Sequence, residues 1–501
     1  MNFNSELQKR PYIGIGCISF IIFTLFLQLT GPYNFCYQEQ WKTFIYSYSY
    51  INNLLSLPGG SMELAANYLI QFFKYPIVGI LITSALLSTI FALYSSIFRR
   101  WTGNYHLLPL TLLPVISLAF LHFNINYLYS GSLSFFLMTI GIALQIRISQ
   151  PLKRFLYSWL SCIFLFVVAG PISMLYACIL FIMECFTSIR KGILYIILPL
   201  SIVLLGQGCL WAGWYGNWKH ILLADGYFTW RLQAGSAIYL PWGATIITFI
   251  LGGIYKKFPA SKKRAIYSLF IIQSLVIGTF FCMNLPQHIN KDNEVFKELN
   301  YWARHEHWDQ IIERCNQIPM TNLLHQNYLN LAFAEKEILN EKIHNYPNMG
   351  IQSLLFTGGR TPYLSAMLSD IYYSMGHIAF SRRYAFEANE SAGNYSPKLL
   401  KRLVQTSLIY GENKLALKYI GILEKTLFYK KWAKKQRYML EKGTEDSNLS
   451  NKRKCLFPDN RFSGSKGLDK DLEEIIKSNP NHQATAQYLE AIRLFIGNII
   501  P

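Results

Sequence analysis

Nine apolar runs within the first 284 residues limit the folds open to this chain of 501 residues. A helix needs about 20 apolar residues to cross the roughly 30 Å of hydrocarbon in a bilayer. Inside hydrocarbon each backbone N–H and C=O must be bonded within its own segment, so runs of this length predict membrane-spanning helices. The runs are Tyr12–Leu29, Tyr75–Phe98, His106–His122, Tyr127–Leu144, Phe155–Ala169, Pro171–Ile189, Ile193–Leu210, Ala237–Ile254 and Ile266–Met283.

The fifth and sixth runs are separated only by Gly170-Pro171. Proline removes a backbone donor and glycine permits a chain reversal, so this pair predicts a tight turn between two short helices. A single kinked helix is the alternative. It would leave eight spans and invert the orientation of everything that follows.

Positive charge in the loops between the runs predicts how the helices are oriented. Cytoplasmic loops of membrane proteins carry an excess of Lys and Arg. With nine spans and a cytoplasmic amino terminus, 14 basic residues lie inside, and the four outside are Lys42, Lys74, Lys219 and Arg231. This asymmetry predicts that the chain after about Asn284 is exported, which in a bacterium with two membranes means the periplasm.

Charge and cysteine distribution exclude several kinds of partner and cofactor. The formal net charge is +19, but 18 basic and only five acidic side chains fall within residues 1–284, where the orientation of the spans accounts for them. Nucleic-acid binding is therefore not predicted. The nine cysteines show no C-x-x-C pair and no Cys/His spacing suited to zinc, so no metal or other cofactor is predicted. The sequence leaves open whether Cys315 and Cys455 pair.

A glycine recurs about 35 residues apart in the predicted soluble part, at Gly376 and Gly411. Each glycine closes one helical pattern and precedes another, in which Ser381 and Ala416 hold matching positions. The pattern resembles the tetratricopeptide repeat, whose period is about 34 residues. It predicts a short α-solenoid, a fold whose concave surfaces bind proteins or peptides. A plain bundle of amphipathic helices stays open as the alternative.

The predicted fold class is all-α, a polytopic α-helical membrane domain followed by a soluble helical-repeat domain. The membrane domain covers residues 1–284 with about nine spans, and the periplasmic repeat domain covers residues 285–441. Residues 442–470 are polar and rich in Gly, Ser, Asn and Lys, which predicts a loop or linker. Residues 471–501 predict a last helical pair around the Asn479-Pro480-Asn481 turn.

Several short segments resemble an uncharacterised family of multi-span membrane proteins of Bacteroides-type bacteria. They are Tyr37-Gln38-Glu39-Gln40, Leu57-Pro58-Gly59-Gly60, Gln71-Phe72-Phe73, and Asn479-Pro480-Asn481 with Tyr488-Leu489. The resemblance covers nearly the whole chain. It implies an amino-terminal transmembrane region and a carboxyl-terminal tetratricopeptide-like domain. It implies no activity, because the family has none assigned.

Two predicted outer loops carry the candidate site residues. In the loop after the first run, Glu39 stands among aromatic side chains, with Trp41 close by. The loop between the seventh and eighth runs adds Asp225, Arg231, Trp214, Trp218 and Trp230. If the loops converge, Glu39 could act as a general base, the rings could stack on a sugar, and Arg231 could bind a lipid-linked phosphate. That chemistry suits a polyprenyl-sugar-dependent glycosyltransferase of the cell envelope.

The simpler interpretation of the rings is the aromatic belt that Trp and Tyr form at the headgroup level of a bilayer. The chain is then not an enzyme but a multi-pass protein of the bacterial inner membrane, whose periplasmic domain meets envelope proteins or glycan intermediates. Both interpretations stay open, and they differ at Glu39. As a base, Glu39 should lie in an aromatic cleft near Asp225 and Arg231, without a structural ion-pair partner.

Overall fold

The computed structural model describes residues 11–229, 232–346, 350–359, 361–444, 446–457 and 467–497. Within these ranges the secondary structure is helical, and the β-type pairing is one isolated bridge between Tyr127 and Phe228. The all-α fold class is therefore confirmed for the described part of the chain.

The chain folds into two compact units, and their boundary is not a single point in the sequence. The first unit holds Met1–Phe35 and Tyr48–Asn290, and the second holds Cys36–Ser47 and Lys291–Pro501. The sequence predicts a single domain for residues 1–284. The structure instead groups twelve residues from the loop after the first apolar run, here called loop 36–47, with the carboxyl-terminal unit.

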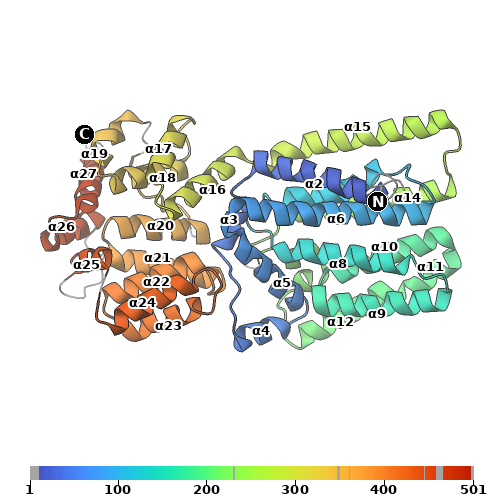
Figure 1. Cartoon of the computed structure of the whole chain (residues 1–501), viewed down its shortest axis with the longest axis horizontal. Helices are drawn as coiled ribbons and strands as arrows, with labels where there is room; N and C mark the ends of the chain where they lie inside the picture. Colours follow the sequence, from blue (N-terminus) through green and yellow to red (C-terminus); the bar gives the residue numbers. More distant parts are fainter. Residues whose placement is uncertain are drawn as a thin grey trace, which may run out of the picture. The chain divides into compact units, whose positions relative to one another are not determined.

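Each of the nine apolar runs is helical in the first unit (Figure 1). The helices are α2 (Pro11–Thr30), α6 (Pro76–Thr102), α7 (Leu112–Leu121), α8 (Tyr129–Gln145), α9 (Pro151–Ala169), α10 (Ile172–Thr187), α11 and α12 (Ile189–Tyr195 and Ile197–Trp211), α14 (Leu240–Lys257) and α15 (Lys263–His288). By length and composition alone, five helical segments could cross a membrane: Pro76–Thr102, Pro151–Ala169, Ile189–Trp211, Ser236–Lys257 and Lys263–His288. In the other four runs, the apolar helical segments found among the described residues are shorter: Gly14–Thr30, Pro109–Leu121, Tyr129–Gln145 and Ile172–Thr187.

Helix α9 ends at Ala169 and α10 begins at Ile172, so the predicted break at Gly170-Pro171 is confirmed. Gly170 has a φ of 73°, a backbone conformation that favours glycine. A Cβ on Gly170 would lie 3.4 Å from the Cα of Gly59, and the N–H of Gly59 donates to the carbonyl of Val167 at 2.9 Å. The turn therefore reverses the chain. It also packs against the loop that precedes α5 (Gly60–Ile70).

Aromatic side chains fill the core of the first unit. The ring of Tyr94 on α6 is buried and lies 6.2 Å from Phe135 on α8 and 6.0 Å from Phe249 on α14. Gly252, also on α14, leaves room for the ring of Phe98 on α6, since a Cβ there would lie 2.5 Å from that ring. Small residues thus let α6 and α14 approach closely.

The second unit is a succession of short helices (Figure 1). They are α16 (Lys291–Arg304), α17 (Trp308–Asn316), α18 (Leu323–Glu335), α19 (Leu339–Lys342), α20 (Pro362–Ser374), α21 (Ile378–Ser391), α22 (Pro397–Ile409), α23 (Asn413–Leu423), α24 (Lys430–Glu441), α25 (Ser447–Arg453), α26 (Leu468–Ser478) and α27 (Gln483–Gly497). From α20 to α24 each helix packs against the next.

The predicted linker 442–470 contains a helix, α25. Two features stabilise α25, although its sequence is polar. The side chain of Asp446 accepts a hydrogen bond from the N–H of Asn448 and so caps the helix, and Leu449 is buried. The part of this stretch at 458–466 lies outside the described residues, and α26 begins at Leu468.

Gly376 and Gly411 occupy the same position in two helix pairs. Gly376 follows α20 with a φ of 77°, and Gly411 follows α22 with a φ of 74°. The residue after each glycine donates its N–H to a carbonyl five residues back, at 2.9 Å in both turns: His377 to Tyr372, and Glu412 to Ser407. This is the Schellman arrangement, in which a left-handed residue ends a helix and satisfies its last carbonyls.

Two further turns have the same geometry without a glycine. Glu306 after α16 has a φ of 58° and Glu337 after α18 has a φ of 60°. In these turns the N–H of His307 reaches the carbonyl of Trp302 at 3.0 Å, and that of Ile338 reaches Phe333 at 2.9 Å. The second unit therefore repeats this type of turn at these four positions. It occurs again after α21, where Gly393 has a φ of 87° and the N–H of Asn394 reaches the carbonyl of Asn389 at 2.8 Å.

Replacing each turn glycine by alanine should separate backbone strain from packing. A Cβ on Gly411 would meet nothing within 4 Å, so Gly411→Ala should lower the free energy of unfolding by only the left-handed strain, about 1–2 kcal/mol. A Cβ on Gly376 would lie 3.1 Å from Cys455 Sγ, so Gly376→Ala should cost roughly 1–3 kcal/mol more. Denaturant unfolding of the purified chain measures both. Equal losses would contradict the packing described around Gly376.

Candidate functional site

Glu39, the candidate catalytic acid, lies at the end of α3 (Asn34–Glu39) and is buried inside the second unit. Its Oε2 accepts a hydrogen bond from Nη2 of Arg304 at 2.9 Å, and its Oε1 accepts one from the hydroxyl of Tyr429. Arg304 also donates from Nη1 to the carbonyl of Cys36 at 3.1 Å. Glu39 is therefore one half of a buried ion pair, and the expectation that it has no structural partner is wrong.

Burial and the Glu39 carboxylate both shift the pKa values of the groups around Glu39. Burial alone would lower the pKa of Arg304, but the Glu39 carboxylate raises that pKa above its usual value, so the guanidinium stays charged. Burial, and then the same carboxylate, raise the pKa of Tyr429, which stays a protonated donor. Burial raises the pKa of the Cys36 thiol to about 12, which makes it a poor nucleophile. Arg304 and Tyr429 therefore hold the Glu39 carboxylate in place.

The rest of loop 36–47 is held at two more points. The hydroxyl of Ser396 donates to the carbonyl of Gln40 at 2.6 Å while it accepts the N–H of Leu399, so it also caps α22. Further along, the N–H of Tyr46 donates to the carbonyl of Lys425 at 2.7 Å. Loop 36–47 is thus bound through its backbone as well as through Glu39, as a docked peptide would be.

Apolar contacts accompany these hydrogen bonds. The ring of Tyr37 lies 6.1 Å from that of Phe296 on α16 and 5.9 Å from that of Trp41. Trp41, a candidate sugar-stacking residue, packs against a buried cluster: Ala366, Ala385, Ala388, Leu399 and Leu403. Trp41 therefore belongs to the packing between α20, α21, α22 and loop 36–47.

A second, partly buried ionic cluster joins α20 to α22. Asp370 lies 2.7 Å from the Nζ of Lys398 and 3.0 Å from Nη2 of Arg402, and Arg402 stacks on the ring of Tyr373 at 3.6 Å. Burial alone would raise the pKa of Asp370, but Lys398 and Arg402 outweigh it and lower that pKa. Sequence analysis missed this cluster and the partners of Glu39, because only the fold brings these charges together.

The candidates in the other loop belong to the first unit. Asp225 lies in the 3₁₀ turn Ala224–Tyr227 and accepts a hydrogen bond from the hydroxyl of Tyr239. Trp214 and Trp218 are about half exposed, at 51% and 50%. Trp230 and Arg231 lie outside the described residues. Because Glu39 and Asp225 belong to different units, their convergence in one cleft stays a prediction.

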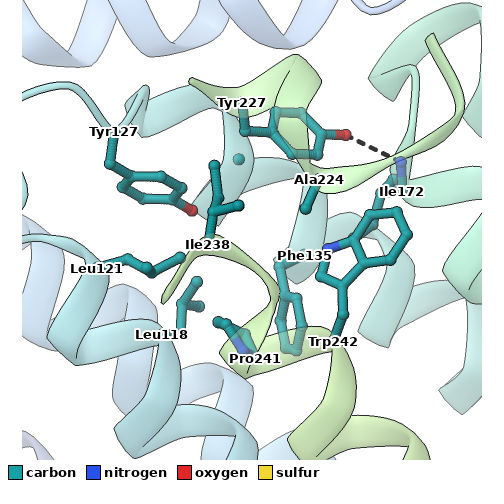
Figure 2. Close-up of a pocket in the computed structure, with 11 residues that line it drawn as sticks. Leu118, Leu121, Tyr127, Phe135, Ile172, Ala224, Tyr227, Ile238, Pro241 and Trp242 are labelled. Atoms are coloured by element: carbon teal, nitrogen blue, oxygen red, sulfur yellow. Dashed lines mark hydrogen bonds between the residues drawn. The ribbon is translucent and has the colours of Figure 1, made fainter. Parts of the chain in front are cut away.

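Near Asp225 the first unit contains a narrow cavity with about 250 Å³ of empty space, part of it open to solvent (Figure 2). Its lining is Leu118, Leu121, Tyr127, Gly131, Phe135, Ile172, Ala224, Tyr227, Ile238, Pro241 and Trp242. Figure 2 shows the hydroxyl of Tyr227 turned toward Ile172, whose N–H donates to it at 3.1 Å. The lining carries no ionisable group other than tyrosine, so the cavity offers apolar contact and no acid–base pair.

The described residues contain neither a bond between the two thiols of the second unit nor a cluster of potential metal ligands. Cys315 and Cys455 are both buried and free, so they do not pair. Within the described ranges, no group of three or more His, Cys, Asp or Glu side chains is placed to hold a metal ion.

Comparison with known proteins gives one match. A family model described as a family of unknown function (DUF6057) matches residues 9–499. No curated protein and no solved structure is significantly similar to the chain.

Proposed function

We propose that this chain, which belongs to the DUF6057 family of unknown function, is an anchored protein of the bacterial cell envelope whose second unit binds partners. In this proposal the first unit crosses the inner membrane nine times from a cytoplasmic amino terminus. The second unit lies in the periplasm and stacks its helix pairs as tetratricopeptide repeats do. The resemblance to a family of Bacteroides-type bacteria belongs to the same proposal.

Length, hydropathy and charge support the anchor. Five helical segments of the first unit are long and apolar enough to span a bilayer, and four shorter apolar helices occupy the other predicted runs. Helices of 16 or 17 residues, such as α10 and α8, fall just below the usual span of about 20. The loop charges, 14 basic residues on one predicted side and four on the other, support the orientation.

The observation that carries the binding role is the repeated turn of the second unit. Helix pairs closed in the same way at Glu306, Glu337, Gly376 and Gly411 favour a stacked array. Such arrays bury their faces against neighbouring pairs and offer an extended surface, which most often binds proteins or peptides. Loop 36–47, held by backbone and side-chain bonds, supports the idea that this unit can bind an extended segment.

The glycosyltransferase alternative needs Glu39 to take a proton from a substrate. Both oxygens of Glu39 already accept hydrogen bonds, from Arg304 and Tyr429, and the side chain is buried. A general base must instead be within hydrogen-bond reach of its substrate. This arrangement supports a structural role for Glu39, and we therefore keep the binding role as the proposal.

Cross-linking from an exposed apolar side chain of the second unit should reveal a partner. Phe386 on α21 is 50% exposed, which makes it a natural site for a photo-reactive phenylalanine analogue. In living cells we expect discrete adducts with an envelope protein or a glycan intermediate, detected by mobility and mass spectrometry. The matched position is Tyr438 on α24, which is 60% exposed but lies outside the helix pairs closed at Glu306, Glu337, Gly376 and Gly411.

Reporter fusions test the orientation on which this proposal depends. A periplasmic reporter should be active after Ile289, and cytoplasmic reporters should be active after Arg100 and after Lys263. A cytoplasmic signal after Ile289 would contradict nine spans. If the fusions give the predicted orientation and Phe386 still forms no adducts, the result would contradict partner binding by the surface around Phe386.

A further inference from the structure

Helix α24 has one buried side and one strongly basic side. Ala433 and Gln436 are buried and face the core of the second unit. Lys430, Lys431, Lys434 and Lys435 are exposed, and residues four apart lie on the same side of a helix. These four lysines form a continuous surface, here called the basic face.

The charge of the basic face is not balanced by nearby acids. Residues 412–446 hold nine basic side chains and five acidic ones: Glu412, Glu424, Glu441, Glu445 and Asp446. Glu412 is paired with Arg382 at 2.7 Å, and Asp446 caps α25. Glu424 is taken up by a bidentate pair with Arg437, with N–O distances of 2.7 and 2.8 Å. Four more exposed lysines extend the positive surface: Lys414, Lys418, Lys425 and Lys442. A partner for this surface must therefore be strongly anionic.

Apolar side chains stand beside the lysines. Tyr438, one turn after Lys434, is 60% exposed, and Leu427, just before the helix, is 48% exposed. Lysines combined with exposed aromatic and aliphatic side chains are typical of surfaces that lie on a bilayer, where the charges meet headgroups and the apolar groups enter the interface. An exposed Leu does not contribute to binding a soluble polyanion, whereas it can enter the bilayer interface.

The start of α24 is also hydrogen-bonded to loop 36–47. Tyr429, the residue before Lys430, donates its hydroxyl to Glu39 of loop 36–47. That loop continues at both ends into the first unit, at Phe35 and at Tyr48. We propose that the basic face of α24 binds anionic lipid headgroups at a membrane surface. This inference goes beyond the proposed function, and its test below does not depend on the orientation of the chain.

Vesicle binding by the full chain tests the proposal. The chain is carried in nanodiscs of phosphatidylcholine and mixed with separate vesicles, with or without phosphatidylglycerol, and co-flotation is measured. Each lysine at an anionic surface should contribute about fivefold, so changing Lys430, Lys431, Lys434 and Lys435 together to Gln should weaken binding by roughly 600-fold. High salt should have a similar effect, because it screens the headgroup charge.

A matched variant removes the same charge elsewhere in the second unit. Its four exposed lysines are Lys291, Lys342, Lys470 and Lys477, all changed to Gln. This variant should keep at least half of the binding. Equal loss in both variants, equal binding to vesicles without phosphatidylglycerol, or tighter binding to a DNA duplex than to the vesicles would each overturn the proposal. Unchanged circular dichroism confirms that each variant is folded.

Discussion

Arg304→Met destabilises the second unit by about 3–5 kcal/mol, the largest effect we expect from one substitution. The change leaves the Glu39 carboxylate buried, with the Tyr429 hydroxyl but without its cation. An uncompensated buried charge costs far more than a lost surface pair. Denaturant unfolding of the purified chain measures the loss. The control is Arg383→Met, because Arg383 is largely exposed in its pair with Glu387 and should cost less than about 1 kcal/mol.

The double variant Glu39→Gln/Arg304→Gln separates the structural role of Glu39 from a catalytic one. Two amides of similar shape can bond to each other without charge, so the double variant should recover most of the stability that Arg304→Met loses. If the cellular function that Arg304→Met disrupts recovers together with stability, Glu39 acts by holding loop 36–47 in place. A stable double variant that stays inactive would instead favour the glycosyltransferase.

Acidification from pH 6.5 to about 3 lowers the stability of the second unit through His482. Burial, and then the neighbouring Lys452, lower the pKa of His482 to about 3, whereas an unfolded histidine titrates near its ordinary 6.5. Between these values the unfolded chain binds a proton that the folded chain does not, so stability is lost as pH falls through this window. We expect about 2–4 kcal/mol from this group.

Lys452 makes stability depend on pH in a second, alkaline range, where stability again rises with pH. Its buried ammonium donates to the carbonyls of Tyr373 at 2.8 Å and Ser374 at 3.1 Å, and lies 2.8 Å from Nε2 of His482. Burial lowers the pKa of Lys452 from 10.5 to about 8. The unfolded chain therefore binds more protons between pH 8 and 10.5, and stability should rise with pH across that range.

Unfolding measured against pH, with and without His482→Gln, isolates the histidine. The variant should flatten the slope between pH 6.5 and 3, and carboxylates common to both chains cancel in the difference. His344→Gln, at an exposed position, serves as the matched substitution. Identical slopes for the chain and for His482→Gln would contradict the buried, neutral state of His482.

Sequence alone predicted the features that depend on local chemistry. The apolar runs became helices because a long apolar segment satisfies its backbone only as a helix, and the break at Gly170-Pro171 follows from two residues that end helices. Gly376 and Gly411 stand at turns because glycine takes a positive φ without strain. The matching turns at Glu306 and Glu337 gave no such signal, since glutamate rarely adopts that conformation.

What sequence could not predict depends on residues far apart in the chain. Glu39 is separated from Arg304 by 265 positions and from Tyr429 by 390. No periodicity links such residues, so loop 36–47 read as a solvated outer loop with one acid. Helix α25 was missed for another reason, because its composition is polar and one buried leucine, Leu449, makes a weak pattern.

The separation of Glu39 and Tyr429 also sets an order of events during synthesis. At about 5–20 residues per second, the 390 positions between them take roughly 20–80 seconds to translate. Throughout that interval the aromatic side chains of loop 36–47 lack the helices that later cover them, so this is the period in which a chaperone would be needed. A fragment that starts at Lys291 would lack the twelve residues of loop 36–47, seven of which are buried, and we expect it to aggregate unless a peptide with the sequence of this loop is supplied.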